Sequence, residues 1–185
     1  MRVKKPRLII VLPVAILAVG VYVYVLNGTP NEELISKVFG NRQIFDSFVA
    51  AQQVTAQRLH WRNRNEITPD ILSNYKRGPS VPVPMSQAQR LKRILQRSSS
   101  YYQGSNAKAC IPDYGVLFTF RSGDRAVQVA LCFNCDMLGI FDGGDDKARS
   151  VNSLPDFDPM RGRLVAIVKK VFPDDAEIQE LDGRR

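Results

Sequence analysis

YGVLFTFRSGDRAVQVAL, residues 114–131, is the stretch that decides the fold, because it predicts a β-hairpin in one register. Large apolar residues alternate with smaller or polar ones on both sides of Gly123-Asp124, a pair typical of two-residue hairpin loops. A slip by one residue would place Phe118 opposite Gln128 and mix the two faces. The favoured register makes three apolar pairs: Phe120 with Val127, Phe118 with Val129, and Val116 with Leu131.

Helical and strand patterns surround this hairpin. A strand pattern covers 53–61, and shorter strands are expected near Tyr75 and over 137–141. Helical spacing covers 30–49, a segment that starts at the capping-box sequence of Ser86 and Gln89, and a segment from Asp158 to Pro173. We therefore expect an α+β fold, in which helices pack on a small, mostly antiparallel sheet built around the hairpin.

The N-terminus carries a hydrophobic run with asymmetric flanks. Residues 8–26 contain no charged residue and, as a helix, span about 28 Å, close to the hydrocarbon thickness of a bilayer. Four Lys or Arg residues precede the run, whereas 27–33 contain none. The positive-inside rule then predicts a cytoplasmic segment at 1–7, a transmembrane helix at 8–26 and one extracytoplasmic domain at 27–185. A cleaved signal peptide is the alternative, but no A-x-A pattern follows the run.

The net charge of +8 is unevenly distributed. Half of it belongs to the four basic residues before the hydrophobic run. Residues 37–97 hold 11 Lys or Arg residues against three acidic ones, so the first half of the domain is basic. Such a surface is either merely solvated or meets anionic headgroups or an acidic partner. Nucleic acid is not expected as a partner behind a membrane anchor.

Three cysteines offer two disulfide pairings. Extending the hairpin register places Cys110 opposite Met137 and diagonal to Cys135. This predicts a Cys110–Cys135 disulfide, with Cys110–Cys132 as the second choice and one buried, functionless thiol left over.

Two chemical roles compete with that structural role for the cysteines. Cys132-Phe-Asn-Cys135 has the spacing of a thiol–disulfide oxidoreductase, but no helical pattern follows it to stabilise a thiolate. The three cysteines and His60 would complete a Cys₃His zinc set, although one C-x-x-C is weak evidence for it. We expect no metal, no cofactor and no catalytic residue.

A basic aromatic surface is the best binding hypothesis. It is composed of Trp61, Arg62, Arg64, Tyr75 and Arg77.

Three segments resemble a pattern in a family of uncharacterised bacterial exported proteins. They begin at Cys110-Ile-Pro-Asp-Tyr-Gly-Val, at Leu131-Cys-Phe-Asn-Cys and at Phe172-Pro-Asp-Asp. The resemblance implies a location in the bacterial envelope and transfers no functional residue. The sequence thus favours a non-catalytic, membrane-anchored envelope domain that binds an unidentified envelope protein or supports an assembly. A thiol oxidoreductase and an enzyme with a site of scattered residues are the alternatives.

Overall fold

The computed structural model describes residues 32–62, 68, 70–102, 108, 110–143, 149–150 and 154–183. The predicted cytoplasmic segment and transmembrane helix, 1–26, lie outside these residues. Within the described ranges, no helix is both long and apolar enough to cross a membrane.

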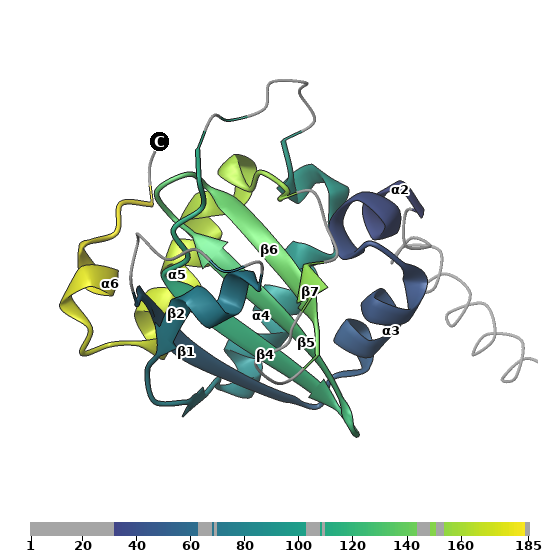
Figure 1. Cartoon of the computed structure of the whole chain (residues 1–185), viewed down its shortest axis with the longest axis horizontal. Coiled ribbons are helices and arrows are strands. Elements are labelled where there is room, and N and C mark those ends of the chain that lie inside the picture. Colours follow the sequence, from purple (N-terminus) through teal and green to yellow (C-terminus); the bar gives the residue numbers. More distant parts are fainter. Residues whose placement is uncertain are drawn as a thin grey trace, which may run out of the picture. The chain divides into compact units, whose positions relative to one another are not determined.

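An antiparallel sheet forms the centre of the domain (Figure 1). Within the described ranges it has seven strands. The order across the sheet is β2-β1-β4-β5-β6-β7, and β3 pairs with a different part of β1. The strands are β1 Gln53–Trp61, β2 Tyr75–Arg77, β3 Val81–Pro82, β4 Val116–Ser122, β5 Arg125–Cys132, β6 Met137–Asp142 and β7 Arg149–Ser150. The predicted α+β class with an antiparallel sheet is therefore confirmed.

The β4–β5 hairpin has the predicted register. Phe118 lies opposite Val129, and the other two predicted apolar pairs form as well. Gly123 opens the two-residue loop with φ 58°, a left-handed conformation that suits a residue without a Cβ. Side-chain alternation and loop chemistry thus agree on one pairing.

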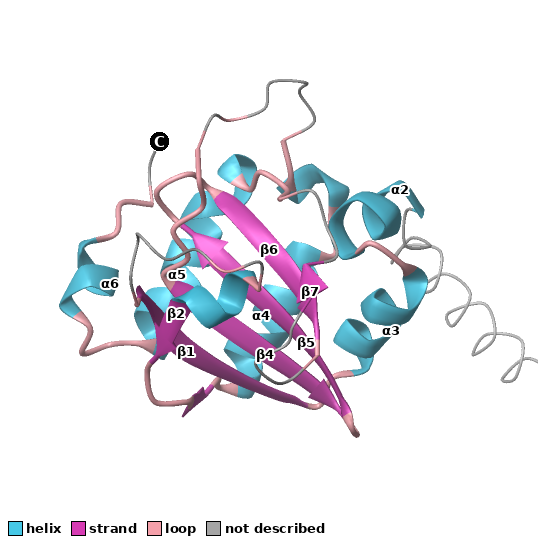
Figure 2. Cartoon of the chain, viewed as in Figure 1, coloured by secondary structure: helices cyan, strands magenta, loops and turns pink. Residues whose placement is uncertain are grey.

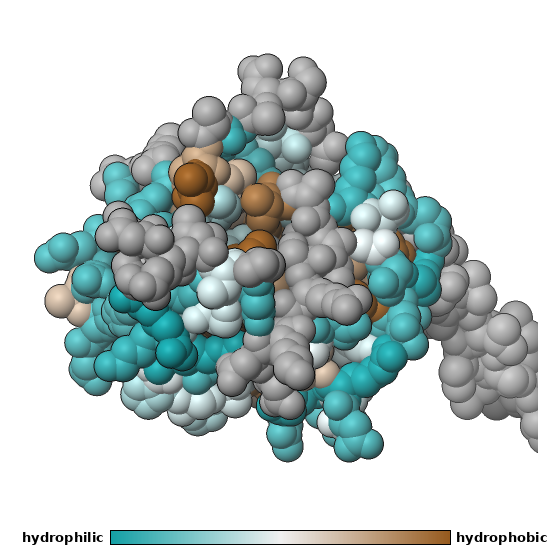
Figure 3. All heavy atoms as spheres, viewed as in Figure 1, coloured by the Kyte–Doolittle hydropathy of each residue, from teal (hydrophilic) through white to brown (hydrophobic). Residues whose placement is uncertain are grey.

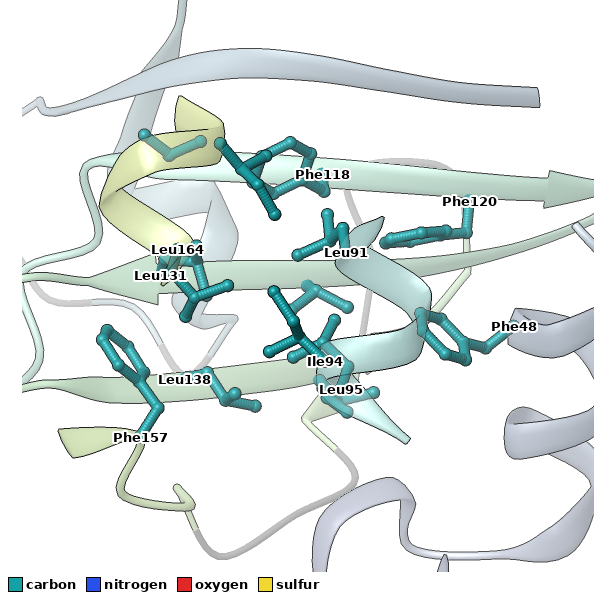
Figure 4. Packing of buried hydrophobic residues seen from close by; sticks show 14 of the residues in the cluster. Phe48, Leu91, Ile94, Leu95, Phe118, Phe120, Leu131, Leu138, Phe157 and Leu164 are labelled. Carbon is teal, nitrogen blue, oxygen red and sulfur yellow. The ribbon is translucent and has the colours of Figure 1, made fainter. Parts of the chain in front are cut away.

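Helices cover one face of this sheet (Figure 2). Their ranges are α2 Glu32–Leu34, the π-helical turn η1 Ile35–Phe39, α3 Arg42–Ala50, α4 Met85–Leu95, α5 Arg161–Val171 and α6 Ala176–Glu180, with 3₁₀ turns η3 Ser98–Ser100 and η4 Asp158–Met160. Leu91, Ile94 and Leu95 of α4 and Leu164 of α5 point into the core against Phe118 and other sheet residues (Figure 4). This large apolar interface is the main stabilising contact of the domain.

The opposite face of the sheet carries a smaller apolar cluster. It includes Leu59 of β1, Leu117 of β4 and Cys132 of β5, and the segment with 3₁₀ turn η2, Ile71–Asn74, contributes Leu72 to it. Tyr114 joins the same cluster from the loop before β4.

The predicted start of α4 at a capping box is wrong. The helix begins at Met85 with Pro84 as its N-cap residue, and no side chain caps it. The Val83 backbone N–H donates to Val54 O at 2.9 Å, which keeps the chain extended along β1 up to that point. The Pro84 carbonyl then accepts from the amides of Gln87 and Ala88, so Ser86 already lies inside the first turn.

Candidate functional site

A cleft of about 340 Å³ opens at the end of the sheet where β1 finishes and β4 begins. The turn after β5 and helix α6 complete its walls. The side chains that give it its chemical character are Arg58, His60, Trp61, Asp113, Phe133 and Glu177. It therefore combines aromatic rings with both signs of charge.

Arg58 connects the segments that form the base of this cleft. Its side chain is only 12% exposed, and its Nε lies 2.7 Å from Oδ2 of Asp175. It also pairs with Glu177 of α6 and donates from Nη1 to Gly115 O at 2.7 Å. Asp175 in turn caps α6 by accepting from the Ile178 amide at 3.0 Å. Arg58 thus joins β1 to the residue before β4 and to α6. Since two carboxylates balance its charge, it is not available to bind an anion.

His60 lies between this cleft and a second hollow. The second hollow, of about 440 Å³, is also lined by Arg58 and by Gly78, Pro79 and Pro173. His60 is exposed on β1 beside Trp61. The described residues lining the two hollows include no Ser, Thr, Cys or Lys, so His60 has no hydroxyl, thiol or amine there to activate.

The predicted basic aromatic surface forms only in part. Trp61 lines the cleft and Arg62 is exposed beside it, whereas Arg77 is half-buried on β2. Arg64 lies outside the described residues.

The prediction is wrong for Tyr75, which was placed on this surface, because the residue is buried at 1% exposure. It stands opposite Trp61 in the β1–β2 register, and their ring centroids are 4.6 Å apart. The Tyr75 hydroxyl donates to Pro112 O at 3.1 Å and accepts from the Tyr114 amide at 3.1 Å. It supports the cleft from behind and does not form its surface.

The cysteines are paired as predicted, Cys110 with Cys135, with their Cα atoms 6.2 Å apart. The register argument behind that prediction is wrong, because Met137 lies opposite Cys132. Cys110 lies in the loop before β4 and not in an extension of the strand. The bond nonetheless joins two walls of the cleft, because Asp113 follows Cys110 while Phe133 precedes Cys135.

This pairing rules out the proposed zinc set, since Cys110 and Cys135 cannot act as thiolates while they are bonded. Among the described residues, no group of three or more His, Cys, Asp or Glu side chains is arranged to hold a metal ion. Cys132 is the remaining thiol and is buried, as the sequence indicated.

We expect Cys132 to be unreactive in the folded protein. Burial raises the pKa of the Cys132 thiol above its ordinary value, so less thiolate is present at neutral pH than in an exposed cysteine. Iodoacetamide should leave the native, non-reduced protein unmodified and add one group after denaturation, as read by intact mass. Rapid alkylation of the native protein would instead support the oxidoreductase hypothesis.

A buried ion pair beside the cleft escaped the sequence-based predictions. Arg161 of α5 forms an ion pair with Asp136, which is fully buried. Arg161 also donates to Phe133 O at 2.6 Å and to Asp182 O at 2.9 Å. One arginine therefore ties the turn that carries Phe133 to α5 and to the chain after α6.

A second basic residue braces the same turn. Lys108 Nζ lies 2.9 Å from Asp156 Oδ2 and 3.0 Å from Asp158 Oδ2, and it donates to Cys135 O at 2.8 Å. Together with Arg161 and the disulfide, it makes the turn after β5 a rigid wall.

The strand side of the domain offers no broad apolar surface among its described atoms. Hydrophobic colour there is confined to small separate spots in a mostly hydrophilic surface (Figure 3). Extensive hydrophobic docking on that visible surface is therefore not indicated.

Comparison with known proteins adds no assignment to these observations, because no family model, no curated protein and no solved structure matches the chain.

Proposed function

We propose that this protein is a membrane-anchored, extracytoplasmic domain that binds a partner protein at the Arg58–His60–Trp61 cleft without catalysing a reaction. The observation that carries the proposal is the Cys110–Cys135 disulfide, which braces the cleft. Structural disulfides persist mainly in oxidising compartments. That environment agrees with the export that the basic residues before 8–26 predict.

The chemistry of the cleft favours a polypeptide ligand. Trp61 offers a half-exposed aromatic ring, and the largely buried Phe133 lines the wall beside it. Asp113, His60 and Glu177 provide polar groups at the margins of the cleft. Protein interfaces combine aromatic anchors with a polar rim in this way. Because Arg58 and the disulfide fix the walls, a partner would meet a site that is already formed.

Site-specific photo-crosslinking in native membranes tests this proposal. A photoreactive residue at His60 should yield one reproducible protein adduct, because His60 is exposed at the margin of the cleft. The same residue at Asp124, which is exposed in the β4–β5 loop, is the matched control and should not give that adduct. Adding Trp61→Ala should abolish the His60 adduct, because it removes the aromatic anchor.

Two results would contradict the proposal. One is an adduct pattern that is the same at both positions or insensitive to Trp61→Ala. The other is turnover of a small molecule by the purified protein that is lost in the Trp61→Ala variant.

A further inference from the structure

Two neighbouring helices present an unusual charge distribution. Helices α4 and α5 pack against each other on the sheet face that the helices cover. Their sequences, MSQAQRLKRIL and RGRLVAIVKKV, contain no Asp or Glu. A solvated helix surface ordinarily mixes the two signs, so this pair of helices departs from the usual pattern.

The basic residues of these helices are arranged along their outer sides. Arg90 and Arg93 are three positions apart on one side of α4, and Arg97 follows two positions after the helix ends. Arg163 and Lys170 are seven apart and share one side of α5. All are exposed except Arg90, which is half-exposed. We call these five residues the basic helix face.

The charges of the basic helix face are not neutralised by the described part of the domain. None of the five residues forms an ion pair with a described residue. Several acidic residues elsewhere do have basic partners. These pairs are Glu33 with Lys37, Glu32 with Arg42, Asp175 and Glu177 with Arg58, and Asp156 and Asp158 with Lys108. Six acidic charges are thus compensated by these pairs, whereas the five basic charges of this face are not compensated by any ion pair with a described residue.

We propose that the basic helix face docks onto the anionic phosphate headgroups of the bilayer that holds the chain. This rests on the proposed function, because an anchor at 8–26 would keep the domain close to that bilayer and make docking an intramolecular event. Long Lys and Arg side chains suit a diffuse layer of phosphates better than they suit one defined ligand. In agreement with this, none of the five residues lines either hollow beside Arg58.

A quenching experiment on the full chain in nanodiscs tests this inference. Gln89→Cys, on the exposed side of α4, carries an environment-sensitive probe, and Asp124→Cys in the β4–β5 loop carries it in the control. With one third phosphatidylglycerol in phosphatidylcholine, acrylamide should quench the probe at residue 89 less than in phosphatidylcholine alone. The probe at residue 124 should be quenched equally in both. Salt at 0.5 M should remove the difference, because screening weakens the attraction to the headgroups.

Two charge-matched triple variants identify the residues responsible. Each basic side chain near an anionic surface strengthens association by about fivefold. Arg90→Gln/Arg93→Gln/Arg97→Gln removes three such charges and should therefore lower the ratio of docked to undocked domain by about tenfold or more. Lys76→Gln/Arg121→Gln/Arg125→Gln removes three exposed charges from the strands and should leave the protection of residue 89 intact.

The outcomes separate this inference from the proposed function. If the chain inserts into nanodiscs but phosphatidylglycerol gives no protection, lipid docking is refuted and the anchor stands. If the chain fails to insert, the anchor is refuted, and sedimentation of the same chain with phosphatidylglycerol vesicles decides the lipid inference alone. Protection that requires added envelope proteins, and not phosphatidylglycerol, would refute lipid docking in favour of an acidic protein partner.

Discussion

Replacing Arg161 with Ala should lower the free energy of unfolding by about 3–5 kcal/mol at neutral pH. The variant would leave Asp136 without its cationic partner in a place where the residue is fully buried. It would also remove the donors to Phe133 O and Asp182 O. Urea denaturation followed by circular dichroism measures the change.

The stability lost in Arg161→Ala should be larger at neutral pH than in mild acid. Burial and then a hydrogen bond with Asp158 raise the pKa of Asp136 above its ordinary value, while Arg161 opposes that rise. Without Arg161 the pKa should rise further. A carboxyl group whose pKa is raised by folding favours the folded state most below its unfolded pKa, and that advantage is lost as pH rises through the folded pKa. The variant should therefore be closest to the wild type in mild acid and furthest from it at neutral pH.

Arg163→Ala is the matched control, because Arg163 lies two positions after Arg161 in the same helix and is exposed. Its effect should stay within about 0.5 kcal/mol. A loss below about 1 kcal/mol for Arg161→Ala at neutral pH would mean that the pair does not hold the turn after β5 to α5.

Removing the disulfide should cost about 3 kcal/mol of stability. Cys110 and Cys135 are 25 positions apart, and a cross-link of that span restricts the unfolded chain by roughly this amount. Comparing the urea midpoints of the wild type and Cys110→Ala/Cys135→Ala under non-reducing conditions measures it.

Reductant provides the control for the disulfide prediction. It should destabilise the wild type and leave the double variant unchanged, since Cys132 is not bonded. Equal stability of the two proteins without reductant would contradict the assignment of a structural role to this bond. Because the bond braces the cleft, the double variant should also give a weaker crosslink at His60.

The parts of the fold that were predicted best are those set by the local pattern of apolar and polar residues. The hairpin register followed from alternation on both sides of Gly123 and Asp124, because a slip by one residue would have placed Phe118 opposite Gln128 and mixed the two faces. The strand at 53–61 and the apolar stripes of α4 and α5 were likewise visible in periodicity alone. The start of α4 was not, because it depends on Val83 pairing with Val54, a contact distant in sequence.

The candidate site was harder to predict because its walls come from separate parts of the chain. Trp61 was identified, but Tyr75 was placed on the surface although it packs behind Trp61. A signal for Arg161 did exist, since it is three positions before Leu164 on the apolar stripe of α5. Its partner Asp136 lies in a turn without periodicity, so no local pattern joined the two.

The claim on which this account depends is that residues 27–185 are exported while 1–7 stay inside. Labelling of right-side-out membrane vesicles with an impermeant amine reagent, followed by peptide mass spectrometry, tests it most directly. Lys76 is exposed on β2 and should be labelled in intact vesicles, whereas Lys4 and Lys5 should be labelled only after detergent is added. The reverse pattern, or a mature chain that begins after residue 26, would contradict the account.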